Sequence, residues 1–60
     1  MTFEEAVQKA KEGHRIRHYH FADDEWFEWK NGALRCELGY DMTRWYKGEE
    51  WQKNDWSICQ

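Results

Sequence analysis

The stretch EWFEWKNGALRCEL, residues 25–38, decides the fold, because it has the pattern of two short strands joined at Asn31-Gly32. A two-residue type I′ turn needs positive φ at both central residues, and Asn-Gly adopts this conformation readily. Aromatic side chains crowd the first strand, and apolar residues recur at every second position of the second strand. They are Trp26, Phe27 and Trp29, followed by Leu34, Cys36 and Leu38. We therefore predict a β-hairpin against which the other elements pack.

The length of 60 residues limits the chain to a single domain, residues 1–60, with a small core. A chain of this size buries only about 60% of its unfolded surface, so its stability is marginal without disulfides, a metal or self-association. Cys36 and Cys59 are the two thiols, and the N-terminus has no secretory hydrophobic stretch. We therefore expect no disulfide framework and a reducing, cytoplasmic location.

The formal net charge is −3, with acidic and basic residues mixed along the chain. A protein that binds nucleic acid non-specifically normally presents a basic face, so this charge argues against nucleic acid as a partner. No apolar run approaches the roughly 20 residues that a membrane-spanning helix needs, so no membrane partner is expected.

The aromatic content is high, since five Trp, three Tyr and three Phe residues accompany few aliphatic branched residues. A core of this size cannot enclose five indoles, so some Trp side chains must lie at a surface, a subunit interface or a ligand site. Exposed aromatic side chains in such places usually contribute to binding. The aliphatic branched residues are Val7, Ile16, Leu34, Leu38 and Ile58.

Residues 2–12 are predicted to form an amphipathic helix. Thr2 and Glu5 have the spacing of a capping box, in which the two side chains satisfy free N–H groups of the first turn. Apolar residues recur at the spacing of one helical face, and Gly13 suits the left-handed conformation that ends a helix. These apolar residues are Phe3, Ala6, Val7 and Ala10.

The rest of the chain is predicted to form short strands and turns. A strand over residues 14–21 would place Ile16 toward the helix, and a polar turn over residues 22–24 would precede the hairpin. Residues 39–41 form a second break, and residues 42–46 form a short strand or an irregular edge. Residues 47–54 are predicted as a charged loop that contains Trp51. Residues 55–59 form the last strand. On the first of these strands, the side chains predicted to face away from Ile16, His18 and His20 are Arg15, Arg17, Tyr19 and Phe21.

The predicted fold class is α+β, with one N-terminal helix packed on a small, strongly twisted antiparallel sheet of four to five short strands. Every connection is short enough for antiparallel neighbours, and none has the length of a βαβ crossover. The chain contains no proline, which removes one means of blocking edge strands. We therefore expect edge pairing into a homo-oligomer.

Both ends of the chain resemble Thoeris anti-defence family two, a family of small phage proteins. Its members typically begin with Met, a polar residue, Phe and an acidic helix, followed by Lys-x-Gly and a strand with a basic and an aromatic residue. They typically end in an acidic residue, a Trp and a short β tail, as residues 55–59 do here. The N-terminal pattern is filled by Phe3, Glu5, Ala6, Lys11, Gly13, Ile16 and Arg17.

This resemblance implies a non-enzymatic protein that forms small oligomers and sequesters a nucleotide second messenger of bacterial immunity in the host cytoplasm, without a cofactor. A base stacks on each aromatic face for about 1–3 kcal/mol. Phosphates bind Arg, Lys or backbone N–H donors, and an acidic residue accepts hydrogen bonds from ribose hydroxyls or an exocyclic amine. The predicted ligand-binding residues are Arg17, Tyr19, Phe21, Trp26, Asp55 and Trp56.

Each of these residues also has a structural interpretation. The aromatic side chains can pack in the core or between subunits. Arg17 can be solvated or form a weak cross-strand ion pair with a hairpin glutamate, and Asp55 can cap the turn before the last strand. Further candidates are Trp45 and Trp51 for stacking and Arg15 and Arg44 for phosphate.

Neither a metal site nor a catalytic site is expected. Structural zinc sites usually show paired close spacings, which Cys36 and Cys59 lack. The acidic run over residues 23–25 sits in a turn without a nucleophile or base beside it. No Gly-rich phosphate loop or catalytic triad spacing is present. The histidines that could act as zinc ligands beside these cysteines are His14, His18 and His20.

A second class of function stays open: a phage inhibitor that docks on a host defence protein, as an anti-CRISPR-like protein or a partial DNA mimic. Two acidic clusters favour it, although a net charge of −3 is low for a DNA mimic. Their members are Asp23, Asp24, Glu25 and Glu28, and Glu49 and Glu50. A third is a single-stranded nucleic-acid binder that stacks bases on its aromatic residues, and the acidic balance counts against it.

Overall fold

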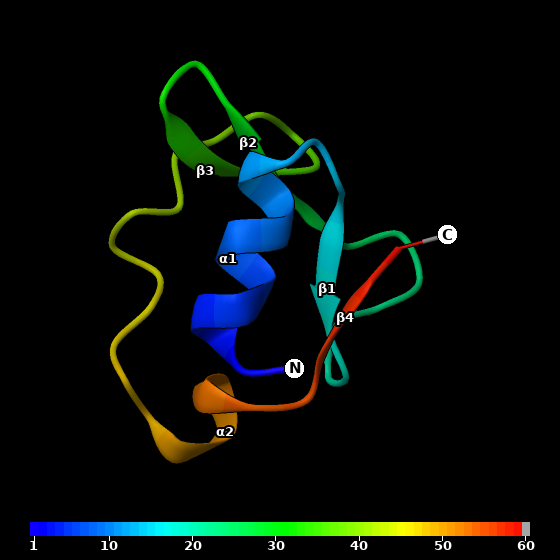
Figure 1. Ribbon diagram of the computed structural model, residues 1–60, viewed down its shortest axis with the longest axis vertical. Coiled ribbons are helices and arrows are strands. Elements are labelled where there is room, and N and C mark those ends of the chain that lie inside the picture. Colours follow the sequence, from blue (N-terminus) through cyan, green and yellow to red (C-terminus); the bar gives the residue numbers. More distant parts are fainter. Residues whose placement is uncertain (60) are drawn as a thin grey trace.

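The computed structural model describes residues 1–59, which contain two helices and four strands. In chain order these are α1 (Phe3–Lys11), β1 (Ile16–His18), β2 (Phe27–Lys30), β3 (Ala33–Cys36), α2 (Glu50–Lys53) and β4 (Trp56–Ile58). The strands form one antiparallel sheet in the order β3-β2-β1-β4, and α1 crosses one face of it (Figure 1). The predicted α+β fold class is confirmed.

The hairpin of β2 and β3 forms where the sequence predicts it. Asn31 and Gly32 have φ of 54° and 77°, as the two-residue turn requires. Trp29 pairs with Leu34 in the resulting register. One detail is wrong: β3 ends at residue 36, and Leu38 lies beyond it with 73% of its surface exposed, because the chain turns away after the strand.

Helix α1 begins and ends as its sequence predicts. The Thr2 hydroxyl accepts a hydrogen bond from the Glu5 amide, and the Glu5 carboxylate accepts one from the Thr2 amide. These Thr2 hydrogen bonds hold the pKa of the Glu5 carboxyl below its ordinary value. Gly13 follows the helix with φ of 104°. Ala6 and Ala10 are buried against the sheet, so the predicted apolar face is the one that packs.

The core lies between α1 and the sheet, and aromatic rings fill much of it. Phe27 and Trp56 are 4% and 3% exposed, and Ile16 is fully buried between them and the helix. The rings of Phe3 and Tyr46 stack with centroids 3.9 Å apart, which holds the 42–46 segment against α1. Trp45 packs edge-on against Trp56. Core packing therefore accounts for part of the aromatic excess.

The predicted charged loop over residues 47–54 is wrong, because α2 forms within it. Gln52 is 3% exposed, and its side-chain oxygen accepts hydrogen bonds from the Lys47 and Glu49 amides. Its side-chain nitrogen donates to the Trp45 carbonyl. These three bonds satisfy a buried amide and fold the segment around it. The buried position of Gln52 depends on the packing of α2 beside α1, which no local pattern of residues 47–54 reveals (Figure 1).

His18 joins β1 to α2 as a fully buried polar residue. Its Nδ1 accepts a hydrogen bond from the His20 amide, so Nδ1 carries no proton. The proton therefore lies on Nε2, which is 2.6 Å from the Trp51 carbonyl oxygen and donates to it. Both ring nitrogens are thus used in holding the turn after β1 and the α2 backbone in place.

The chain covers parts of both sheet edges with its own backbone. At the β3 edge, the Met42 amide donates to the Leu34 carbonyl and the Cys36 amide donates to the Tyr40 carbonyl. At the β4 edge, the N-terminal ammonium donates to the Trp56 carbonyl, and the Trp56 amide donates to the Met1 carbonyl. Fewer backbone N–H and C=O groups are therefore free at the sheet edges to pair with another chain than the absence of proline led us to expect. Residues 42–46 form an irregular edge, one of the two predicted outcomes.

Candidate functional site

A groove of about 800 Å³ lies on the face of the sheet that α1 leaves uncovered. Because strand side chains alternate between faces, Ile16 and His18 reach the core while Arg15 and Arg17 point to the groove side. Ser57 of β4 is the cross-strand partner of Arg17. The lining side chains that could bind a ligand are those of Arg15, Arg17, Asp23, Trp26, Ser57 and Cys59.

The Arg17 guanidinium is held in place by the loop between β1 and β2. Its Nη2 donates to the Phe21 carbonyl at 3.0 Å and lies 3.7 Å from the Asp23 carboxylate. The Arg17 side chain is 30% exposed, so the group reaches the groove while its position is constrained. A guanidinium has further N–H donors beyond the one used here, and these suit a phosphate or carboxylate.

Arg15 and Trp26 form the second feature of the groove. The Arg15 guanidinium carbon lies 4.1 Å from the centroid of the Trp26 ring, within the range of a cation–π interaction. The Glu28 carboxylate lies 4.0 Å from Arg15 Nε, so the guanidinium contacts both an indole and a carboxylate. The Arg15 side chain is 58% exposed, so a ligand can approach it from solvent.

The Cys59 thiol lines the groove but is not activated as a nucleophile. Partial burial raises its pKa above the ordinary value, and the positive charges of Arg17 and Arg15 offset only part of that effect. The reactive form of cysteine is the thiolate, so a thiol with a raised pKa stays protonated near neutral pH. Cys59 therefore contributes a small, weakly polar side chain to the lining of the groove.

Two of the six predicted site residues meet in the groove, namely Arg17 and Trp26. The predicted strand over residues 14–21 is too long, because β1 ends at residue 18 and a turn follows. Tyr19 is consequently directed into solvent with 78% of its surface exposed. Phe21 packs against Phe27 with centroids 5.0 Å apart, so only its carbonyl oxygen serves the site through Arg17.

The other two predicted residues lie outside the groove. Trp56 is on the core face of β4, opposite His18, and its indole N–H donates to the Gln52 carbonyl at 2.7 Å. Asp55 has φ of 70°, and its carbonyl accepts the Tyr19 amide in the turn before β4. Asp55 therefore contributes through its backbone, and its predicted capping of the turn by the side chain stays a prediction.

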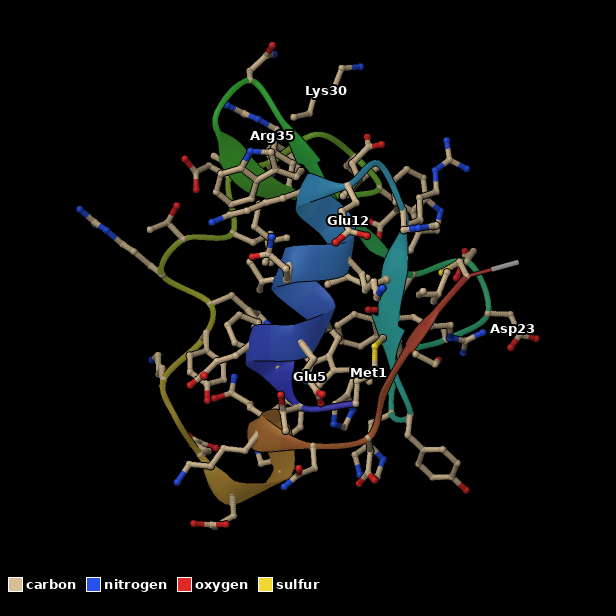
Figure 2. All side chains as sticks on the ribbon, viewed as in Figure 1. Met1, Glu5, Glu12, Asp23, Lys30 and Arg35 are labelled. Carbon is tan, nitrogen blue, oxygen red and sulfur yellow. The ribbon has the colours of Figure 1, made fainter. Side chains whose placement is uncertain are left out.

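The sequence does not predict Arg15, Asp23, Ser57 and Cys59 as members of one site. Arg15 was already a phosphate candidate, and the period of two along residues 55–59 puts Ser57 and Cys59 on the face opposite Trp56. What the sequence lacked was the pairing of β4 with β1, which joins residues about forty positions apart in the chain. Asp23 enters the site because the loop carries it beside β4 (Figure 2).

Comparison with known proteins found no match to this chain among protein-family models, curated proteins or solved structures. Within residues 1–59, no helix has the length and apolar character needed to cross a membrane. The same residues bring together no group of three or more His, Cys, Asp or Glu side chains that could hold a metal ion.

Proposed function

We propose that this chain binds a nucleotide in the groove between β1, β4 and the loop over residues 19–26, and so removes it from solution. The proposed role is that of a non-enzymatic, phage-type counter-defence protein that sequesters a nucleotide second messenger of bacterial immunity in the host cytoplasm. The observation that carries the proposal is the placement of two arginines and an indole in one solvent-open groove.

The phosphate would bind at Arg17. The guanidinium is fixed through its hydrogen bond to the Phe21 carbonyl, so little side-chain freedom is lost when a ligand binds. Ser57, directly across from Arg17, offers a hydroxyl donor to the same anion. Charge-assisted hydrogen bonds of this kind are worth about 1.5–3 kcal/mol each.

The base would extend the stack that Arg15 and Trp26 already form. A guanidinium plane can hold an aromatic base, as an indole can, and such stacking tolerates any base because every base has a π-face. The half-exposed Arg15 side chain leaves room for a ring on its solvent side. The site therefore supports a nucleotide, with selectivity among bases left to other contacts.

Binding is tested by calorimetry and thermal shift with a panel of cyclic nucleotides and ADP-ribose derivatives. A bound ligand raises stability by RT ln(1 + [L]/Kd). Arg17→Ala is expected to weaken binding by roughly tenfold to a hundredfold, from the loss of a charge-assisted bond at about 1.4 kcal/mol per factor of ten. Arg44→Ala is the matched control, since Arg44 is an exposed arginine away from the groove.

The proposal is overturned if Arg17→Ala and Trp26→Ala still bind every nucleotide that the unaltered protein binds, with unchanged Kd. To identify the natural ligand, the purified protein is incubated with extracts of immune-activated bacteria, and retained small molecules are identified by mass spectrometry. Retention of a nucleotide by the unaltered protein and its loss in Arg17→Ala is the expected result.

A second candidate function, docking on a host defence protein, is favoured by the exposed apolar residues outside the groove. Leu38 and Tyr40 are 73% and 67% exposed and lie two positions apart in the turn after β3. A protein that works in this way gains no stability from any nucleotide in the panel. The thermal-shift experiment therefore separates the two candidates.

A further inference from the structure

We propose that Asp23 sets the charge of the anion that the groove accepts, so that a singly charged phosphodiester binds in preference to a doubly charged terminal phosphate. This inference rests on the proposed binding of a nucleotide at Arg17. It concerns a residue that the proposed function leaves without a role, although its carboxylate lines the groove.

Asp23 occupies the position that an incoming anion would take. Its Oδ1 lies 3.7 Å from Nη2 of Arg17, and its side chain is fully exposed. The loop backbone beneath it is fixed, because the Glu25 amide donates to the Ala22 carbonyl and the Ala22 amide donates to the Glu25 carboxylate. Asp23 projects outward from this loop (Figure 2). Because its side chain is exposed, the carboxylate can turn away from Arg17 while the loop keeps its shape, and a phosphate bound at Arg17 would then lie near its negative charge.

The charges around the groove are balanced. Arg17 faces Asp23, and Arg15 faces Glu28, so two cations stand beside two carboxylates. Repulsion between Asp23 and a ligand grows in proportion to the ligand charge, and the cost of removing an ion from water grows with the square of its charge. A groove without excess positive charge offers little to offset that cost for a dianion. A monoanionic phosphodiester is therefore the better match.

Asp23, rather than Glu28, is assigned this role because of where each carboxylate lies. Glu28 is on β2, 29% exposed and directed at Arg15, which itself covers Trp26. Asp23 lies beside the guanidinium proposed to hold the phosphate. Replacing Asp23 with asparagine removes one negative charge from the groove while preserving the shape of the side chain.

The test compares adenosine 3′,5′-cyclic monophosphate with adenosine 5′-monophosphate, which share a base, a ribose and one phosphate. Measurements at low ionic strength and about pH 8 keep the monoester doubly charged, since its second ionisation lies near pH 6. Binding is followed by calorimetry for the unaltered protein, Asp23→Asn and Asp24→Asn. Asp24 is the matched control, because it is the neighbouring aspartate and is not among the groove-lining residues within 1–59.

The unaltered protein is expected to bind the cyclic nucleotide more tightly. Asp23→Asn is expected to tighten binding of the cyclic nucleotide about threefold, which is the scale of one exposed charge pair. For the doubly charged nucleotide the repulsion that is removed is twice as large, so its binding should tighten by about the square of that factor, roughly tenfold. Asp24→Asn is expected to leave the ratio of the two affinities unchanged.

Two results overturn the inference while the proposed function stands. In the first, both nucleotides bind and Asp23→Asn leaves the ratio of their affinities unchanged. In the second, Asp24→Asn changes that ratio as much as Asp23→Asn does. Absence of binding for both nucleotides and for the rest of the nucleotide panel, in the unaltered protein and in Asp23→Asn, overturns the proposed function together with the inference. Thermal unfolding of each variant verifies that the fold is retained.

Discussion

Replacing Trp56 with alanine is expected to destabilise the fold strongly rather than to remove a ligand contact. The side chain is 3% exposed and packs against the rings of Phe3, Phe21 and Phe27. Truncating a buried Trp costs about 3–5 kcal/mol. At about 0.05–0.15 kcal/mol per residue, a chain of 60 residues has a free energy of unfolding of roughly 3–9 kcal/mol. The substitution therefore removes between about a third and all of the free energy of unfolding.

A milder variant, Trp56→Phe, makes the same point quantitatively. It keeps a ring in the core but leaves the buried Gln52 carbonyl without its indole donor, which costs about 1–3 kcal/mol. Urea unfolding followed by far-ultraviolet circular dichroism measures the loss without relying on Trp fluorescence. Tyr19→Ala is the control, because its 78% exposed ring should contribute no more than about 0.5 kcal/mol.

Two outcomes would refute this reasoning. The first is a free energy of unfolding for Trp56→Ala within about 1 kcal/mol of that of the unaltered protein, because removal of a buried indole should cost more than this. The second is Trp56→Phe with unchanged stability and lost nucleotide affinity, which would place the indole at the ligand rather than in the core.

Two further predictions concern the segments that flank the core. Gln52→Leu leaves the Lys47 and Glu49 amides without their acceptor, so it should lower stability by about 1–3 kcal/mol and speed hydrogen exchange over residues 47–53. Unchanged exchange in α2 would contradict this. At neutral pH, Glu5→Gln should lower the melting temperature, because hydrogen bonds with Thr2 keep the carboxyl pKa lower in the folded state than in the unfolded state. That stabilisation is fully present at pH values above the ordinary pKa of a glutamate carboxyl, and it is lost as the pH falls through the folded-state pKa. The melting curves of Glu5→Gln and of the unaltered protein should therefore converge at acid pH. The same pair of proteins can be compared with Thr2 replaced by alanine. If the melting temperatures still differ at neutral pH and converge at acid pH to the same extent, the capping box is not the cause of the pH dependence.

The elements that the sequence predicts well are those specified by neighbouring residues. The Asn31-Gly32 turn, the Thr2–Glu5 capping box and the glycine after α1 each depend on contacts within a few positions of the chain. Alternation in β4 similarly places Trp56 and Ser57 on opposite faces before any partner strand is known. Local backbone preference and side-chain periodicity carry this information, so the α+β class follows from them.

Burial and long-range pairing decided the remainder. Phe21 packs against the core because β1 ends at residue 18 and the chain turns there. Helix α2 forms in a polar segment because the buried Gln52 side chain makes three hydrogen bonds to the backbone. The groove exists because β4 pairs with β1, bringing Ser57 opposite Arg17. A sequence pattern states which face of a strand a side chain takes, but only the packed chain determines what lies across from it. The free energy that selects among pairings is the burial of the whole core, not a property of any one stretch.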